Sequence, residues 1–383
     1  MRQMGVGMQF NYNLPVNIIF GRGKAKEVGT QTAKYGTKAL IVTGGTSTKK
    51  SGLLERTIAL LKTASIDSVV FDEVTPNPLT TTVYKGAEIA NQNGCNVIVG
   101  IGGGSSMDAA KAIAFQAANG GNISDYIFGH KVSDKALPII LLPTTCGTGS
   151  EGNGFAVLSN PETNDKKSLR CNGIVAKCSI VDPELMMTMP KQILAAVGFD
   201  ALCHNMEAYL SKSAQPFATM HALEAIRLLG ENLVEVYQNP DYLEGWDNIT
   251  FASTLGGMVI HIAGVTAPHG MEHPASGLKN IVHGRGLAAL TPVIIEESIT
   301  AAPEKYAMIS KLLGGEDEKD LVVVIKKLLL DLDLTTTLSE LGVKEEDISW
   351  MAENCLKISA ASLNGHPMQF GLEDLKRIYR KAL

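Results

Sequence analysis

Four side chains in the second half of the sequence could together hold a divalent metal ion. Asp200 and His204 are four residues apart, a spacing that on a helix places both side chains on one face, about 5–6 Å apart at Cβ. His269 and His283 can supply two further imidazoles. One carboxylate and three imidazoles suit Zn²⁺ or Fe²⁺ and leave a position for a substrate oxygen. The alternative is a hydrogen-bonded Asp200–His204 pair with no metal.

Residues 269–273 also spell His-x-x-Glu-His, the pattern of inverzincin metallopeptidases. In such an enzyme His269 and His273 would bind zinc, and Glu272 would act as general base. A peptidase would leave the Asp200–His204 pair without a role, and Pro274 would disturb the continuation of a ligand-bearing helix. We therefore keep an HxxEH metallopeptidase only as a remote alternative.

Two segments rich in glycine and hydroxyl groups could bind the phosphates of a dinucleotide. Residues 102–105 (Gly-Gly-Gly-Ser) follow an apolar run and precede a helical pattern, so backbone N–H groups can approach a phosphate at a helix N-terminus. Asp108 falls in the first helical turn. Residues 144–151 follow the next apolar run. Open α/β sheets bind ligands at such loops, although tight turns without a ligand are the alternative.

A third segment indicates which dinucleotide is used. NAD is usually held by an acidic residue near the end of an early strand. Here the apolar run ends in Thr43-Gly44-Gly45-Thr46-Ser47, followed by Lys49 and Lys50, with no carboxylate to repel a 2′-phosphate. We therefore expect NADP(H) rather than NAD(H). The alternative is that the lysines only begin a solvated helix.

The elements that must position these residues change character halfway along the chain. Apolar runs at 39–43, 68–71, 96–101 and 138–142 alternate with helical patterns, which predicts a parallel sheet covered by helices on both faces. After about Lys191 helical spacing takes over. We predict a Rossmann-like α/β dinucleotide-binding domain over residues 1–190 and an all-α, metal- and substrate-binding domain over residues 191–383.

The composition excludes several classes of protein. With 383 residues, 45% of them hydrophobic, the chain can bury the cores of two domains, which excludes disorder. A net charge of −5 gives no electrostatic case for nucleic acid or for an anionic membrane as partner. The six cysteines form no CxxC pair and no export signal is apparent, so we expect reduced thiols and a cytoplasmic location.

Taken in order, these motifs resemble the iron-containing (group III) alcohol dehydrogenase family. The resemblance runs from Phe20-Gly21-Arg22-Gly23 to beyond Pro292 and includes Asp182-Pro183-Glu184. The segment from His269 to Leu290 is similar to the NADPH-dependent butanol dehydrogenase and aldehyde reductase branch. The resemblance implies a dehydroquinate synthase-like fold and a homodimer.

The resemblance also implies roles for individual residues. Fe²⁺, or alternatively Zn²⁺, would be bound by Asp200, His204, His269 and His283. His273 would lie near the nicotinamide, and we expect it to relay a proton, since imidazole titrates near neutrality. The cofactor-binding residues expected from the motifs are Gly44, Gly45, Ser47, Gly102, Gly103, Gly104, Ser105, Asp108, Thr144, Thr145, Ser150 and Lys166. Lys167, beside Lys166, leaves the register of that last position open.

The predicted function is metal-dependent hydride transfer between NADP(H) and primary alcohols or aldehydes. The segments 254–265 and 268–277 are mostly small and apolar, which favours a short-chain substrate. Glycerol or polyol dehydrogenases and dehydroquinate synthase-like lyases share the fold and stay as alternatives. A non-enzymatic dinucleotide-binding module is a third, but such a module would need no metal ligands.

Overall fold

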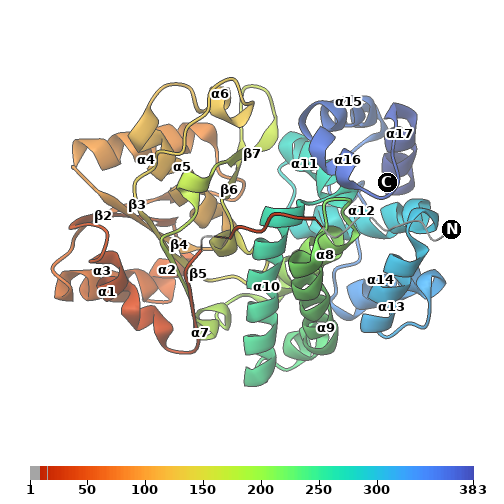
Figure 1. The fold of residues 1–383 in the computed structure, drawn as a ribbon, viewed down its shortest axis with the longest axis horizontal. Helices are drawn as coiled ribbons and strands as arrows, with labels where there is room; N and C mark the ends of the chain where they lie inside the picture. The colour runs from red at the N-terminus through yellow and green to blue at the C-terminus, as the bar shows by residue number, and fades with distance from the viewer. Residues whose placement is uncertain (1–8, 15) are drawn as a thin grey trace.

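A six-stranded parallel sheet forms the core of the first half of the chain. The computed structural model describes residues 9–14 and 16–383. Figure 1 shows the sheet domain beside a second, helical domain. The strand order is β1-β8-β5-β4-β2-β3. The strands are β1 (Ile18–Phe20), β2 (Lys38–Gly44), β3 (Asp67–Val74), β4 (Val97–Gly102), β5 (Ile139–Pro143) and β8 (Cys178–Val181).

Continuous apolar runs form the central strands because helices cover both faces of the sheet. Leu40 and Val42 of β2 pack in one core cluster, with residues of α4 (Thr80–Gln92) and α5 (Gly104–Asn119). Ala39 and Ile41 point the other way, into a cluster that includes residues of α1 (Val28–Thr32) and α3 (Leu53–Thr63). Alternate side chains of β2 therefore pack into the two hydrophobic cores on opposite faces of the sheet.

The four strands predicted from apolar runs are confirmed as β2, β3, β4 and β5. The sequence reasoning did not include β1 and β8, which are only three and four residues long. It also did not include the antiparallel hairpin of β6 (Phe155–Ser159) and β7 (Lys166–Arg170). β7 begins with two lysines and carries little apolar character, so no hydrophobic pattern marks it.

Helix α8 (Lys191–Leu210) is the centre of the helical domain, as its sequence suggests. It is apolar on nearly every side, and a helix of this kind must be buried. It packs against α9 (Pro216–Gln238), α10 (Leu243–Ala263) and α12 (His283–Ser298). The other longer helices of this domain are α11 (Ala267–Lys279), α13 (Pro303–Leu312), α14 (Leu321–Asp331), α15 (Ile348–Ile358) and α17 (Leu372–Lys381). The predicted fold class, a parallel α/β domain followed by an all-helical domain, is confirmed.

Among the described residues, no single helix is long and apolar enough to cross a membrane. Helices α10 and α11 meet the length and composition test only when taken together, across a bend of 100°.

The two domains meet in a backbone contact between two glycines. Gly149 has φ +56° and immediately precedes the short 3-10 helix η2 (Ser150–Gly152). Gly257 lies opposite it on α10, and a Cβ atom added at Gly257 would lie 1.8 Å from the Gly149 carbonyl oxygen. Any side chain at position 257 would therefore push the loop that precedes β6 away from the helical domain.

Gly257→Ala tests this contact. Inside a helix, glycine to alanine normally stabilises by about 1 kcal/mol. Here we expect destabilisation by about 1–3 kcal/mol, as in other overpacked sites, measured as a lower urea midpoint. Gly365→Ala is the matched control, because its Cβ would lie 3.6 Å from Ser211 Oγ, in ordinary contact. An unchanged or higher midpoint for Gly257→Ala would contradict the close contact.

Candidate active site

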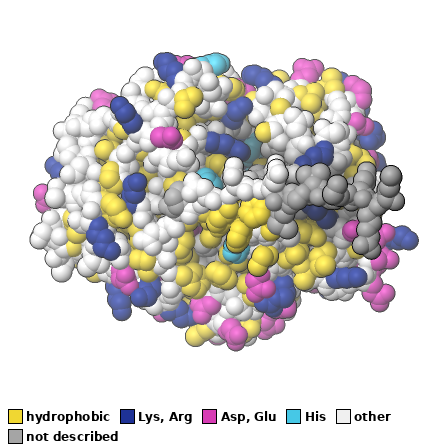
Figure 2. Space-filling view, in the orientation of Figure 1, with side chains coloured by type: hydrophobic (Ala, Val, Ile, Leu, Met, Phe, Trp, Pro, Cys, Tyr) yellow, Lys and Arg dark blue, Asp and Glu magenta, His cyan; other side chains and the backbone are white. Residues whose placement is uncertain are grey.

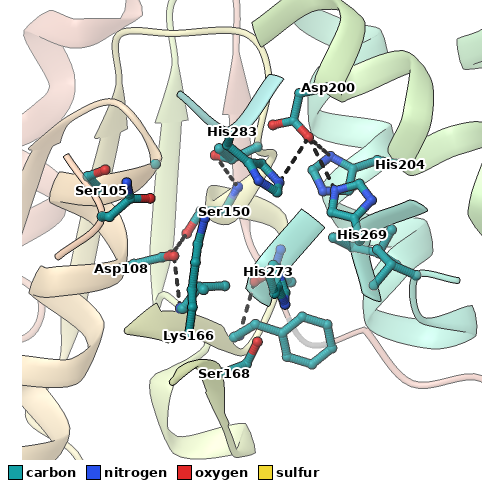
Figure 3. Close-up of a pocket in the computed structure, with 18 of the residues that line it drawn as sticks. Ser105, Asp108, Ser150, Lys166, Ser168, Asp200, His204, His269, His273 and His283 are labelled. Carbon is teal, nitrogen blue, oxygen red and sulfur yellow. Dashed lines mark hydrogen bonds and ion pairs between the residues drawn. The ribbon is translucent and has the colours of Figure 1, made fainter. Parts of the chain in front are cut away.

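A cleft between the two domains contains most of the predicted chemistry-bearing residues. It encloses about 820 Å³ of empty space, counting its open mouth, a size typical of ligand pockets. Figure 3 shows side chains from both domains turned toward one another in it. The predicted site residues that line the cleft are Gly104, Ser105, Asp108, Ser150, Lys166, Asp200, His204, His269, His273 and His283.

Three of the four predicted metal ligands converge on one point. Asp200 Oδ1 lies 3.3 Å from His269 Nε2 and 3.7 Å from His283 Nε2. The potential ligand atoms of Asp200, His269 and His283 all lie within 4.8 Å of one another. His204 lies beside this set: its Nδ1 is 3.6 Å from Asp200 Oδ1, and its ring stacks on that of His269 at a centroid distance of 4.4 Å.

The positions of these residues follow from three helices. Asp200 and His204 are one turn apart on α8, as their spacing predicted. His269 lies in the first turn of α11, and His283 is the first residue of α12. Asn280, with φ +51°, caps α11 in the left-handed conformation and lets the chain turn back within three residues. His283 is thereby brought to the same side as His269.

A buried carboxylate behind His269 completes one side of the cluster. Glu207 Oε1 lies 2.5 Å from His269 Nδ1, and its other oxygen accepts from Thr266 N at 2.6 Å. Burial alone would lower the pKa of His269, but Glu207 and Asp200 outweigh burial and raise that pKa to about 10. Burial would raise the pKa of Asp200, yet His204 and the other imidazoles hold it well below its usual value.

This electrostatic balance fits a cation. Asp200 and Glu207 both lie against His269 and favour a positive charge there, and a divalent ion between Asp200, His269 and His283 would supply that charge instead. Metal ligation requires neutral imidazole, so binding would release the His269 proton. An imidazole that ligates through Nε2 while Nδ1 meets a carboxylate is the usual arrangement at protein metal sites.

On the opposite wall, the start of α5 lies against the loop after β5. A Cβ atom at Gly104 would lie 2.4 Å from Thr148 Cγ2, so only glycine allows this approach. Asp108 lines the cleft, but its carboxylate accepts from Ser150 Oγ at 2.6 Å and from Val157 N at 2.9 Å. Asp108 therefore joins α5 to the second glycine-rich loop and to β6.

Lys111, one helical turn after Asp108, is a supporting residue that the sequence reasoning did not identify. Its side chain is fully buried, and its ammonium donates to Ser150 Oγ, Asn153 Oδ1 and the Phe155 carbonyl at 2.7, 3.1 and 2.7 Å. Burial lowers the pKa of Lys111 to about 8, against the opposing effect of Asp108. The available signal was a single lysine within a run of alanines in α5, three residues after the aspartate.

Lys166 and His273 face the cleft between the cofactor loops and the imidazole cluster. Lys166 Nζ lies 3.6 Å from Glu272 Oε2, whereas Lys167 turns away and lies over the Phe128 ring at 4.9 Å. Burial, together with Lys166, holds the pKa of His273 well below its ordinary value. We expected His273 to titrate near neutrality; its surroundings instead shift its pKa downward, because desolvation disfavours the charged form.

Other predicted cofactor residues lie outside the cleft lining. They are Gly44, Gly45, Ser47, Gly102, Gly103, Thr144 and Thr145, all at or just beyond the carboxyl ends of β2, β4 and β5. Near Gly45 the structure places a carboxylate that the sequence reasoning did not consider. Asp72 of β3 pairs with Lys49, and the Asp72 carbonyl oxygen would lie 3.4 Å from a Cβ at Gly45.

Comparisons with known proteins agree with this geometry. Residues 15–183 match the model of the family described as iron-containing alcohol dehydrogenase, and residues 194–383 match the C-terminal model of the same family. Neither match favours a peptidase or a dehydroquinate synthase-like lyase. Among curated relatives, a 1,3-propanediol dehydrogenase from Citrobacter freundii is 35% identical, covering 97% of this chain and 98% of its own.

A second relative and a solved structure extend the comparison. An NADH-dependent butanol dehydrogenase A from Clostridium acetobutylicum is 31% identical, covering 98% of this chain and 100% of its own. An archaeal halo-thermophilic alcohol dehydrogenase from a Red Sea brine pool, solved bound to NZQ, superposes with a TM-score of 0.95 at 36% identity, covering 99% of this chain and 100% of its own. The chain belongs to the iron-containing alcohol dehydrogenase family.

Proposed function

We propose that this protein interconverts primary alcohols and short aldehydes by metal-dependent hydride transfer with NADP(H). The observation that carries the proposal is the shared cleft: Asp200, His269 and His283 converge on the wall opposite the glycine-rich start of α5. A ligand set for a cation and a phosphate-type loop thus open onto one cavity, which is what a nicotinamide-dependent, metal-assisted reaction needs.

The chemistry divides between the bound groups and the chain. Fe²⁺, or alternatively Zn²⁺, held by Asp200, His204, His269 and His283 would supply a Lewis acid that favours the alkoxide or polarises the aldehyde carbonyl. Glu207 fixes the His269 ring so that Nε2 faces Asp200. His273 lines the cleft, and we expect it to accept a proton from the alcohol and return one to the product.

The cleft walls favour a short substrate. Phe155 and Val157 of the hairpin and Ile260 and Val265 of the helical domain line it, so part of the cleft wall is apolar. The start of α5 and Ser150 would bind the pyrophosphate, and Lys166 would reach the cofactor ribose. The carbon to be reduced would then meet the nicotinamide in a water-poor space.

The preference for NADP(H) rests on the loop after β2. Residues 44–47 carry no acidic side chain, and Lys50 follows with no ion pair to any residue that the structure describes. Lys49 is engaged by Asp72, so Lys50 is the cation left to meet a 2′-phosphate. The butanol dehydrogenase relative is NADH-dependent. The proposal for NADP(H) therefore rests on the residues of this chain and not on that relative.

His269→Ala tests the metal site. It removes one imidazole from the cluster and leaves Glu207 without its partner, so we expect metal content and hydride transfer to be lost. NADPH binding, followed by quenching of its fluorescence, should stay within about twofold, because the phosphate loops are in the other domain. His130→Ala is the control, because His130 is exposed and does not line the cleft. Full metal content in His269→Ala would refute the assignment.

Gly44→Asp tests the cofactor assignment. A Cβ there would lie 3.4 Å from the Val74 carbonyl and 3.9 Å from Ser106 Oγ, so a Cβ is tolerated in ordinary contact. Its carboxylate would accept from the ribose hydroxyls of NAD(H) and repel a 2′-phosphate. We expect the ratio of kcat/KM for NADPH over NADH to fall by about tenfold or more, equivalent to about 1.4 kcal/mol. Gly44→Ala controls for the added Cβ; equal ratios in both variants would count against the proposal.

We also propose a homodimer, supported by an apolar surface over α9 and α10. Figure 2 shows hydrophobic side chains gathered there. Met220 of α9 and Leu243 of α10 are 68% and 50% exposed. Large exposed apolar patches are rare on monomeric proteins and often mark a surface that contacts another protein. Light scattering should give twice the 40.8 kDa of one chain, and Met220→Glu should lower that mass; a monomeric wild type would reject the proposal.

A further inference from the structure

The glutamate of the His-x-x-Glu-His segment is buried where a general base could not reach a substrate. Glu272 is completely inaccessible and does not belong to the cleft lining, although His269 and His273 of the same segment do. Its carboxylate instead lies behind His283. A buried charge is costly unless it is paired, so its partners indicate what it is for.

We propose that Glu272 is a positioning residue for the metal site, which orients His283 as Glu207 orients His269. This inference rests on the proposed function, since it takes Asp200, His269 and His283 as metal ligands. In both pairs a buried glutamate oxygen lies against Nδ1 of the imidazole, as a hydrogen bond at His269 and as an ion pair at His283. In both pairs Nε2 is the atom that faces Asp200. Each carboxylate therefore selects the tautomer that leaves Nε2 free for a cation.

The packing around Glu272 holds its carboxylate in this place. Ser276, one turn later on α11, donates its hydroxyl to Oε1. Gly286 of α12 makes the space: a Cβ there would lie 2.8 Å from Glu272 Cγ and 2.9 Å from Oε1. Gly286 is three residues after His283, so the helix that presents the imidazole also leaves room for its partner.

The remaining neighbour of Glu272 connects the metal site to the cofactor side of the cleft. Lys166 Nζ lies 3.6 Å from Oε2, the same oxygen that meets His283. The lysine compensates the charge of the carboxylate, and the carboxylate in turn holds the lysine at the edge of the cleft. Lys166 and His283 are 117 residues apart in sequence (283 − 166), and Glu272 is the group between them.

A second metal ion is the competing explanation. Glu272, His273 and His283 also present atoms within 4.8 Å of one another. An ion there would have to displace the Lys166 ammonium from the carboxylate and would need both nitrogens of His283. The positioning role requires neither change, and it predicts one metal ion per chain.

The test measures metal affinity in metal-free protein, by competition of Zn²⁺ with a chromophoric chelator. We expect Glu272→Ala to weaken Zn²⁺ binding by about 10- to 100-fold, the usual effect of removing a partner of a metal-bound histidine. Glu272→Gln has the same shape, and its amide oxygen can still accept from Nδ1–H, so we expect an intermediate loss. Glu296→Ala, which removes an exposed glutamate of α12, is the control and should bind Zn²⁺ like the wild type.

A double variant separates positioning from general structural damage. In a His283→Ala background, Glu272→Gln should cause no further loss of affinity, because its effect passes through the missing imidazole. The absorption spectrum of Co²⁺-substituted protein should change in Glu272→Gln and stay unchanged in Glu296→Ala. If Glu272→Ala does not fold, Glu272→Gln and its spectrum carry the test.

Several results would overturn the proposal. They are wild-type affinity in both Glu272 variants, an additive loss in the His283→Ala background, and two Zn²⁺ ions per chain of which one is lost in Glu272→Gln. Failure of the proposed function looks different: wild-type protein would bind no Zn²⁺, or His269→Ala would bind it as tightly as the wild type.

Discussion

Asp200 is 2% exposed on the most deeply buried helix of the second domain, and its charge is tolerated only because imidazoles surround it. An isolated carboxylate in such a place would be protonated or would destabilise the fold. Helices α11 and α12 must therefore begin where they do, so that His269 and His283 join His204 around it. The same concentration of donors around one buried oxygen is what allows the site to accept a cation. Folding of this domain and metal chemistry thus share one electrostatic requirement.

The cofactor side is organised by a second buried charge, of opposite sign. The ammonium of Lys111 reaches across from α5 to the loop after Gly149 and to the start of β6. Asp108 holds the same loop through Ser150. That loop rests on α10 through the contact of Gly149 with Gly257. The distance between the phosphate-type loops and the imidazole cluster is therefore set by buried side chains and by direct backbone packing.

What the sequence could predict depended on how local each signal was. Continuous apolar runs predicted the central strands. A spacing of four residues within one helix predicted that Asp200 and His204 lie together. Short strands such as β1, β8 and the lysine-led β7 have no such pattern, because neighbours distant in sequence hold them in place. The roles of Glu207, Lys111 and Asp72 could not be predicted either, because their partners are distant in sequence. A buried glutamate becomes a partner of His269 only when residues 62 positions apart meet. The His-x-x-Glu-His pattern also gave no sign of the role of Glu272. Its carboxylate meets His283 of α12 and Lys166 of β7, which lie in other elements of the fold.

The proposed function requires one divalent metal ion between Asp200, His269 and His283, facing a cofactor bound along α5. The most direct measurement is a crystal structure of the protein with NADPH and Fe²⁺ or Zn²⁺, using anomalous scattering at the absorption edge of the metal. The account predicts one anomalous peak per chain within bonding distance of these three side chains, with His204 turned to join them, and the nicotinamide in the adjoining cleft. A peak at another position, or a fully loaded crystal with no peak at this site, would contradict it.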